Sequence, residues 1–517
     1  MPAAAPQAHE LSLADAVRTA IASDADLYIA REDARDAADG IALARAAFTM
    51  RLFGELYGTR DDQPPSATSF AAADTIAAAT FGIAGRVETG LTYRVSAGLR
   101  RQDRDDPFST VYDAATTTTL RAEVVQPLWR GAFAAARKPI VVASLRRDRS
   151  EHELRARIER TVGTVQVAYW NLVRARAEQD ARASAIAFAQ EQADESTRLH
   201  RLGTGSELDV IEAEAAVSRR RQESLRTGQD VVEADGRLFE ALGVRAGDAG
   251  WAAGAAIVPI DVAQLEPRAV EVDAQLALVR TRRADVLAAH DRIAAELAAL
   301  EVTDDQRRAA LDLVAVAGTV GFAGVFESTY ATAGVNGRND GAGGGGALDP
   351  PYRTDPAYDG GLGGSLRNAI GRDMNLFIGL RFEMPLGHHE AEVRHTIQRR
   401  SVARARLAER ETLAQIESEV RTTVARLAVD VQLVEAADRA VELAGQLLEG
   451  TRKRFRVGAS TSFDVLRVSE ELTRAQIEAA RARADYRVSL TRLAAATGTL
   501  LDGSGITLES LGASPPQ

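Results

Sequence analysis

Three histidines come nearest to a metal-binding cluster in this sequence. His388 and His389 are adjacent, and His395 follows six residues later. Imidazole is a common ligand of transition metals, but a structural zinc site takes four His, Cys or acidic ligands in suitable spacing. The chain has no cysteine and no His-Glu-x-x-His motif. We therefore interpret the three histidines as surface residues of a strand-to-helix turn, and we predict neither a bound metal nor any other cofactor.

The other motifs that carry chemistry also point away from an enzyme. Gly343–Gly346 is a glycine run, but no Lys-Ser or Lys-Thr pair follows it as in a phosphate-binding loop. A Gly-x-Ser-x-Gly motif is absent, and no cysteine can act as a nucleophile. The acids of the helical segments follow the i, i+4 spacing of solvated helix faces. The sequence therefore predicts a protein that is not an enzyme.

Composition narrows the possible partners and compartments. The net charge of −10 and the isoelectric point near 5.5 argue against nucleic acid as a partner. The sequence contains no run of 18 apolar residues, so we predict no transmembrane helix. Residues 1–10 lack the basic region and apolar stretch of a signal peptide. We predict that they are a flexible lead-in, and we expect an envelope protein whose signal peptide has been removed.

A duplication organises the chain. The segment 201–210, RLGTGSELDV, reappears at 456–465 as RVGASTSFDV. In both copies a long polar helical pattern ends at a glycine and a second helical pattern follows. The match continues downstream without a gap, so that Leu238 falls in the register of Leu493. Such internal similarity predicts two tandem structural repeats.

The two repeats are predicted to contain the same series of elements. Repeat one, 11–250, is expected to have a helix at 11–47, strands within 50–126, a long helix at 133–200 and a helix at 206–242. Repeat two, 251–500, is expected to have a helix at 268–300, strands within 311–384, a long helix at 390–455 and a helix at 461–497. The tail, 501–517, is predicted to be disordered.

The long helices need several packing partners. Helix 133–200 would be about 100 Å long and twice the length of its neighbour, so a further helix must stack end to end on the shorter one. Apolar residues recur along it in steps of four and three, the spacing of supercoiled helices; they are Ile158, Val162, Val165, Tyr169 and Leu172. Because aromatic residues make up only 5% of the chain, the cores are thin. This pattern favours helices that form the wall of a barrel built from several chains.

The strands call for the same kind of assembly. Arg86–Arg100 alternates between apolar and strongly polar residues, as expected for a β-barrel with lipid outside and water inside. Open sheet edges are not tolerated in lipid, so several chains must complete one barrel. The alternative is one face of a soluble β-sandwich. Glu88-Thr89-Gly90 resembles a turn, and the hairpin around it would either join the barrel or decorate a loop.

Together these features resemble the TolC-like outer membrane efflux proteins, or outer membrane factors, of Gram-negative bacteria over residues 11–500. The shared marks are the duplicated order of elements, the strand exits Gln126-Pro127-Leu128 and Met384-Pro385-Leu386, and the two glycine turns each followed by Asp-Val. The resemblance implies an α+β membrane protein. It would be a homotrimer with a 12-stranded transmembrane β-barrel continued by a long periplasmic α-helical barrel.

The resemblance also implies a function and partners. The protein would be the passive exit duct of a tripartite efflux pump or type I secretion system, exporting small molecules such as drugs, or proteins. It would lie in the outer membrane with its helical part in the periplasm, and it would work with a periplasmic adaptor protein and an inner-membrane transporter. The alternative from the residues alone is a soluble or periplasmic coiled-coil scaffold or adaptor component. The exported substrate and the resting state of the gate are not specified by the sequence.

Finally, the resemblance assigns roles to the two glycine turns. Adaptors would dock at the hairpin ends, formed here by Leu202, Gly203, Thr204, Val457, Gly458 and Ala459. The aperture acids of the family fall on Asp464 and on Arg467, where this chain departs from the usual acid; repeat one offers Asp209 and Glu212. The Tyr and Arg that hold closed relatives shut fall on Phe455 and Ser460. Because these cannot reproduce the bonds of Tyr and Arg, we predict a gate that depends on packing between Phe455 and Leu208.

Overall fold

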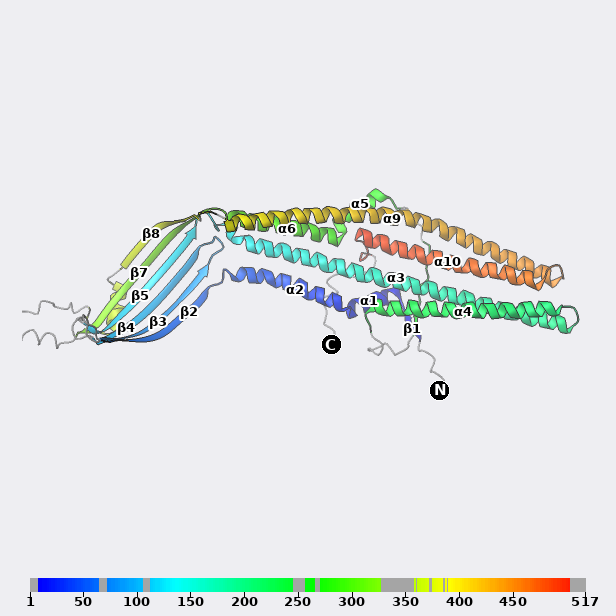
Figure 1. The fold of residues 1–517 in the computed structure, drawn as a ribbon, viewed down its shortest axis with the longest axis horizontal. Coiled ribbons are helices and arrows are strands. Elements are labelled where there is room, and N and C mark those ends of the chain that lie inside the picture. Colours follow the sequence, from blue (N-terminus) through cyan, green and yellow to red (C-terminus); the bar gives the residue numbers. More distant parts are fainter. Residues whose placement is uncertain are drawn as a thin grey trace, which may run out of the picture. The chain divides into compact units, whose positions relative to one another are not determined.

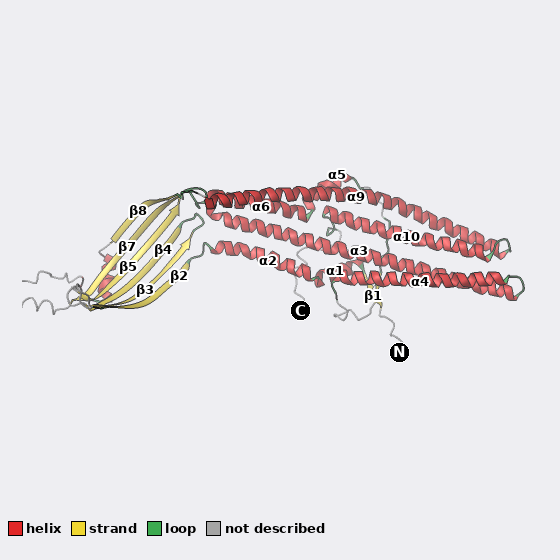
Figure 2. Cartoon of the chain, viewed as in Figure 1, coloured by secondary structure: helices red, strands yellow, loops and turns green. Residues whose placement is uncertain are grey.

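The computed structural model describes residues 8–64, 72–105, 112–244, 256–265, 270–326, 358, 360–371, 374–384, 386–387 and 389–502. Its elements fall into two compact units, and Figures 1 and 2 show the order of helices and strands within each. One unit consists of residues 1–37, 145–293 and 404–517, and the other of residues 38–144 and 294–403. The first unit is mainly helical, and the second holds a large β-sheet.

Eight of the described helices form four pairs of equal length. The longest are α3 (Ala134–Arg201) and α9 (His389–Arg456), each of 68 residues, followed by α4 (Glu207–Leu242) and α10 (Ser462–Thr497), each of 36 residues. The shorter helices are α1 (Leu13–Ser23) and α5 (Val272–Arg282), each of 11 residues, and α2 (Ala25–Ala46) and α6 (Ala284–Asp305), each of 22 residues. These paired lengths are what a duplicated chain would give.

The two helices predicted at 11–47 and 268–300 are each interrupted once. Asp24 and Arg283 adopt extended backbone conformations that separate α1 from α2 and α5 from α6. The Asp24 carboxylate accepts a hydrogen bond from the Asp26 backbone N–H at 2.8 Å and so caps α2. Ser23 Oγ donates to the carbonyl oxygen of Leu242 at 2.5 Å, so the end of α4 meets the break between α1 and α2.

The predicted helical seam forms the core of the helical unit. Its five members, Ile158, Val162, Val165, Tyr169 and Leu172, are at most 1% exposed. A second cluster contains the corresponding residues of α9, among them Val420, Val424 and Leu427. The step of four and three residues therefore identified the buried face of both long helices.

A small parallel sheet was not expected from the sequence. Residues 8–10 of the predicted flexible lead-in, together with Leu11, which was predicted to begin a helix, form strand β1 (Ala8–Leu11). It pairs with β6 (Ala256–Pro259). Both strands are held against the helices, because Arg176 of α3 donates to the carbonyl oxygen of Ile257 at 2.7 Å and Asp235 of α4 accepts from its N–H at 3.1 Å. The rest of the lead-in and residues 503–517 of the tail lie outside the described residues.

The second unit contains a six-stranded antiparallel sheet in the order β2-β3-β4-β5-β7-β8 (Figure 1). The strands are β2 (Arg51–Gln63), β3 (Ala72–Arg86), β4 (Thr92–Asp105), β5 (Tyr112–Pro127), β7 (Ala310–Phe326) and β8 (Met374–Glu383). The turn at Glu88-Thr89-Gly90 joins β3 to β4, and both strands pair fully with their neighbours. The hairpin is thus part of the sheet. The sheet has six strands, whereas a 12-stranded trimer would require four strands per chain.

The register of the sheet separates an apolar from a polar face. One row across all six strands is entirely apolar and consists of Leu52, Ile83, Val95, Ala122, Ala317 and Leu376. The next row, whose side chains point to the opposite face, contains Phe53, Gly82, Ser96, Arg121, Gly318 and Asn375. The alternation predicted for 86–100 is confirmed for β4, while Val87 lies in the turn.

Helix α8 (Leu362–Gly371) lies on the apolar face of the sheet, between β7 and β8 in the chain, where no helix was predicted. Thr118 of β5 and Ser365 of α8 form a buried hydrogen bond between their hydroxyl oxygens at 2.8 Å. Asn368 Nδ2 donates to the carbonyl oxygen of Phe322 at 2.8 Å. Small and polar residues therefore face the sheet, whereas Leu362, Leu366 and Ile370 are exposed. The preceding glycine-rich residues 334–357 lie outside the described part of the chain.

A valine at position 321 is expected to displace α8. A Cβ atom on Gly321 would lie 1.8 Å from the carbonyl oxygen of Ser365, far inside van der Waals contact. A disulfide engineered between T118C and S365C, which should form readily in the parent, is therefore expected to fail to form when Gly321→Val is added. Gly58→Val is the control, since its Cβ would meet only Ile76 at 3.7 Å. Equal disulfide yields in both variants would contradict this packing.

Within the described ranges, no helix has a stretch that is both long and apolar enough to cross a membrane.

Candidate functional site at the two hairpin ends

The two glycine turns have the same backbone geometry. Gly203 ends α3 with φ of 74° and Gly458 ends α9 with φ of 76°, a left-handed conformation that glycine adopts readily. At the first turn, Gly203 N–H donates to the His200 carbonyl and Thr204 N–H to that of Leu199. Gly458 and Ala459 repeat this pattern at the second turn. Both long helices therefore end in a Schellman motif, which fixes the direction in which the chain leaves.

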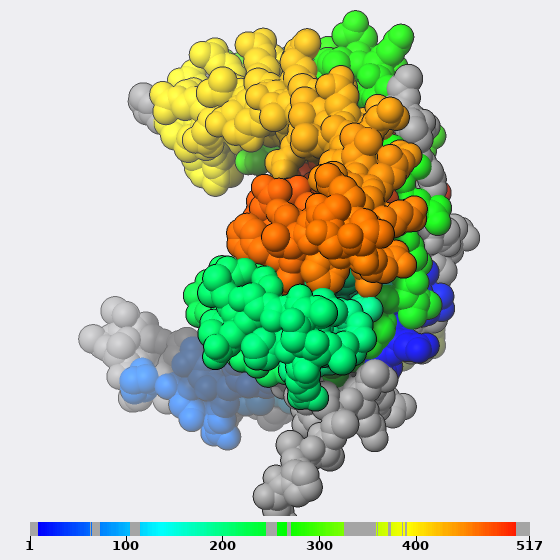
Figure 3. Space-filling model, turned by 90° about the vertical axis from the view of Figure 1, so that its right-hand side faces the viewer, coloured from blue at the N-terminus to red at the C-terminus, as the bar shows by residue number. Residues whose placement is uncertain are grey.

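The apolar residues of the turns are open to solvent in the single chain. The side chains of Leu202 and Val457 are 64% and 78% exposed, and Leu208 is 61% exposed. The ends of the two hairpins lie side by side, as the space-filling view from that side shows in teal-green and orange (Figure 3). Two apolar side chains on rigid turns thus offer a contact surface for another molecule.

The predicted aperture acids have a structural role in this conformation. Asp209 and Asp464 are the third residues of their helices and complete capping boxes with Ser206 and Thr461. The carboxylate of Asp464 accepts hydrogen bonds from Thr461 N–H at 3.1 Å, Thr461 Oγ1 at 2.8 Å and Ser460 Oγ at 3.1 Å. These bonds, with that from the Thr461 backbone foremost, lower the pKa of Asp464 below its ordinary value. The acid therefore stays charged at physiological pH.

The remaining predicted gate residues take up local positions. Arg467 lies 4.0 Å from Asp464 on the same helix, so the two opposite charges pair within one chain. Phe455 and Ser460 are half-buried, as is Glu212. The gate that we predicted from packing between Phe455 and Leu208 stays a prediction.

Loss of one helix cap is expected to loosen one hairpin end only. In the Thr461→Ala variant, the Asp464 N–H loses its partner, and such a change costs about 1 kcal/mol. Hydrogen–deuterium exchange of residues 462–466 should become faster, while residues 207–211 keep their rate. Ser206→Ala is the matched variant with the reverse expectation. Unchanged exchange at both ends would show that the caps do not hold these turns.

Behind the turns, a buried arginine joins the two hairpins. Arg220 of α4 is 5% exposed and donates to the carbonyl oxygens of Ala185 at 2.9 Å and Leu466 at 3.1 Å. It also donates to Ser469 Oγ at 2.6 Å. Burial lowers the pKa of the guanidinium, while Glu470, 3.5 Å away, favours its charged form. Arg220 therefore links α4 to both α3 and α10.

Two further contacts join the hairpins closer to the turns. Ser462 at the start of α10 is buried and bonds through Oγ to Gln192 Nε2 and to Ser196 Oγ of α3, both at 3.1 Å. On α9, Arg452 lies 3.2 Å from Glu191 and 4.9 Å from the centre of the Phe188 ring. Sequence reasoning missed these residues. The sequence did contain one signal for this contact. Arg220 falls seven residues, or about two helical turns, after Ala213, and so it lies on the apolar face of α4.

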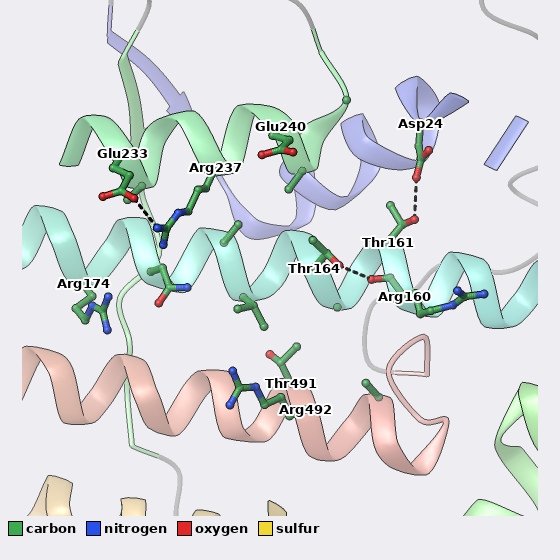
Figure 4. Close-up of a pocket in the computed structure, with 18 of the residues that line it drawn as sticks. Asp24, Arg160, Thr161, Thr164, Arg174, Glu233, Arg237, Glu240, Thr491 and Arg492 are labelled. Carbon is green, nitrogen blue, oxygen red and sulfur yellow. Dashed lines mark hydrogen bonds and ion pairs between the residues drawn. The ribbon is translucent and has the colours of Figure 1, made fainter. Parts of the chain in front are cut away.

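A groove along α3 shows no arrangement of catalytic or binding groups. It has a volume of 1710 Å³ and is bounded by α3, α4 and α10, with Asp24 at one end (Figure 4). Its charged side chains pair locally, since Arg237 bonds to Glu233 at 2.5 Å and Thr161 donates to Asp24 at 2.8 Å. No group of three or more His, Cys, Asp or Glu side chains able to hold a metal occurs among the described residues. His388 lies outside those residues.

Comparison with known proteins gives this geometry a context. Residues 353–499 match the sequence model of the family described as outer membrane efflux protein. A search of curated protein sequences gave no match.

Solved structures of bacterial outer membrane proteins share the fold. The CmeC outer membrane channel of Campylobacter jejuni superposes with a TM-score of 0.61 at 13% identity, covering 94% of this chain and 86% of CmeC. The outer membrane protein VceC of Vibrio cholerae gives 0.59 at 17% identity, with 94% and 96% covered. The MtrE outer membrane channel of Neisseria gonorrhoeae in its open state gives 0.59 at 14% identity, with 94% and 89% covered. Residues 353–499 thus carry the sequence pattern of the outer membrane efflux protein family, and the chain has the fold of the TolC-like outer membrane channels.

Proposed function

We propose that this protein is an outer membrane channel that serves as the passive exit duct of an envelope export machine. The observation that carries the proposal is the row of apolar side chains across all six strands of the sheet, next to a row on the other face that contains Ser96, Arg121 and Asn375. Lipid on one side and water on the other is the environment that matches this pattern. Much of the apolar face, including Leu52 at 83% and Leu376 at 69% exposure, lacks a protein cover in the single chain.

We further propose that three copies assemble. The two outer strands of the sheet, β2 and β8, leave main-chain groups unpaired, and these must be satisfied if the sheet lies in lipid. Pairing of β8 of one copy with β2 of the next would satisfy them. The resemblance to the TolC-like proteins supports threefold symmetry and a periplasmic α-helical barrel made of the long helices. A soluble scaffold would have no use for the bare apolar face.

The hairpin ends are our candidates for adaptor docking. Their exposed Leu202 and Val457 would contact a periplasmic adaptor, which connects the duct to an inner-membrane transporter. A photo-crosslinking amino acid placed at either position is expected to capture an envelope protein in the host. The same amino acid at exposed Ser218 of α4 should capture much less. Equal crosslinking at all three positions would argue against docking at the turns.

The same turns would control opening. Asp464 with Arg467, and Asp209 with Glu212, would line the aperture, and Phe455 with Ser460 would replace the Tyr and Arg of closed relatives. A ring that mixes acid and base should favour cations less than an all-acid ring does. The cargo would be small toxic molecules or proteins, in a tripartite efflux pump or a type I secretion system.

Membrane fractionation followed by reconstitution tests the proposed function. The protein is expected in the outer membrane fraction, and the detergent-purified protein should produce stepwise conductance in planar lipid bilayers. Electron microscopy should show a trimer. A protein that is soluble without detergent and forms no channels would overturn the proposal.

A further inference from the structure

We propose that the β3–β4 hairpin is part of the barrel wall, so that three copies close an 18-stranded pore wide enough for bulky polar cargo. This inference rests on the proposed function, since it assumes a threefold assembly in a membrane. It concerns the number of strands that each chain contributes, which is six in the described sheet. Three times six gives the total.

The pairing of the hairpin shows that it is not a decoration at the edge. β3 and β4 are interior strands of the sheet, and residues Ala72 to Ala84 of β3 pair with the whole length of β2. β4 pairs with β5 from Thr92 to Asp103. Among the described strands, β2 pairs with β3 alone. The strand at one edge of the sheet is therefore attached to the rest only through β3 and β4.

The side chains of the hairpin continue both faces of the sheet. On the apolar face, Ile83 and Val95 lie between Leu52 of β2 and Ala122 of β5. On the polar face, Ser96 lies beside Arg121, and Gln102 donates to both carboxylate oxygens of Asp74 at 2.8 and 2.9 Å. A hairpin that hung free in water would not need an apolar face in register with the membrane face of its neighbours.

Closure of six strands per copy is geometrically consistent. Six strands are fewer than the eight of the smallest outer membrane barrels, so one copy cannot close alone. Because the strands alternate in direction, β8 of one copy runs antiparallel to β2 of the next, as an antiparallel barrel requires. The 13 residues of β2 and the 10 residues of β8 are long enough to span a membrane when tilted.

Strand number sets the size of the pore. With strands about 4.8 Å apart and tilted by about 40°, 18 strands give a backbone diameter of about 36 Å, compared with about 24 Å for 12 strands. Barrels of 16–18 strands leave an aqueous channel. Because the polar face lines this channel, the cargo is water-soluble. Because the pore is wider, the cargo can have a larger cross-section than a 12-stranded exit admits.

Lipid quenching of single cysteines tests the position of the hairpin, because the chain has no native cysteine. An environment-sensitive fluorophore is attached in the full-length protein at I83C or V95C, and at L52C or L376C as references in the same row. The protein is reconstituted in phosphatidylcholine vesicles containing brominated lipid. All four sites are expected to be quenched strongly, whereas S96C and N375C on the polar face should be quenched several-fold less.

The outcomes separate the two proposals. Quenching at L52C and L376C but not at I83C and V95C would place the hairpin outside the wall and overturn the 18-stranded pore, while the membrane channel would stand. An absence of quenching at every site would overturn the channel itself. Native mass spectrometry of the detergent-solubilised protein supplies the copy number, expected to be three chains of 55.2 kDa. Two chains would give 12 strands and overturn the wider pore.

Discussion

Replacement of Arg220 with alanine is expected to lower the free energy of unfolding by about 3 kcal/mol, as found when one partner of a buried charged network is removed. The guanidinium of this buried side chain donates to Ala185, Leu466 and Ser469. After its removal, the two carbonyl oxygens and Ser469 Oγ each lose one hydrogen-bond donor, and the carboxylate of Glu470 loses one of its opposite charges. The melting temperature, followed by circular dichroism in detergent, should fall by several degrees.

Two further variants define the cause of that loss. Arg219→Ala removes the neighbouring arginine, which is exposed, and should melt like the parent protein. Arg220→Lys keeps the charge, but its donors all lie on one nitrogen, which cannot replace both Nη1 and Nη2, so this variant should lie between the parent and Arg220→Ala. If Arg220→Ala and Arg219→Ala melt at the same temperature, the arginine does not hold the hairpins together.

Replacement of Tyr169 with alanine is expected to cost about 4 kcal/mol, in the range for deleting a buried aromatic side chain. The ring is fully buried and packs edge-to-face on Trp170, with 5.5 Å between ring centres. Its hydroxyl oxygen lies 2.6 Å from Asp261 Oδ2 and 3.0 Å from the carbonyl oxygen of Leu11. Burial raises the pKa of Tyr169, so the hydroxyl stays protonated over the physiological range.

The same tyrosine holds the small parallel sheet in place, which gives the prediction a second readout. Asp261 follows β6 and also accepts from the Leu13 N–H at 2.7 Å, so Tyr169 connects β1, α1 and β6 to α3. Limited proteolysis should cut residues 8–11 faster in Tyr169→Phe, with a loss of only about 1 kcal/mol of stability. Tyr28→Ala, at a side chain that is 41% exposed, is the control. Unchanged cleavage in Tyr169→Phe would show that the hydroxyl does not anchor the strands.

Much of the helical part could be predicted from local signals. Glycine turns, N-cap residues and apolar residues in steps of four and three are determined within a few residues of the chain, so the ends of α3, α4, α9 and α10 fall within one residue of their predicted positions. Ser12, a residue type that is common at helix starts, caps α1, because its side chain accepts a hydrogen bond from the Asp15 N–H at 3.1 Å. Strand alternation likewise identified the apolar face of β4.

Other features depend on contacts that are distant in sequence. The breaks at Asp24 and Arg283 occur where the ends of α4 and α10 pack against them. At the second break the two backbones approach closely, because a Cβ atom added to Gly498 would lie 2.7 Å from Arg283 Cα. β1 forms only by pairing with β6, some 250 residues away. Helix α8 carries its apolar residues on the side away from the sheet, which is the reverse of the pattern used to recognise a helix packed on a core. The arginine that joins the hairpins likewise needs partners from two other helices, α3 and α10.

The way in which β3 and β4 enter the sheet has a consequence for how such proteins can diverge. A hairpin leaves and returns at the same end of its neighbours, so its gain or loss changes the strand count by two and reverses no strand. The flanking strands β2 and β5 keep their direction, and the alternation of apolar and polar side chains continues across the new pair. Evolution can therefore change the width of this sheet by a single insertion of about 40 residues, without a compensating change in any helix.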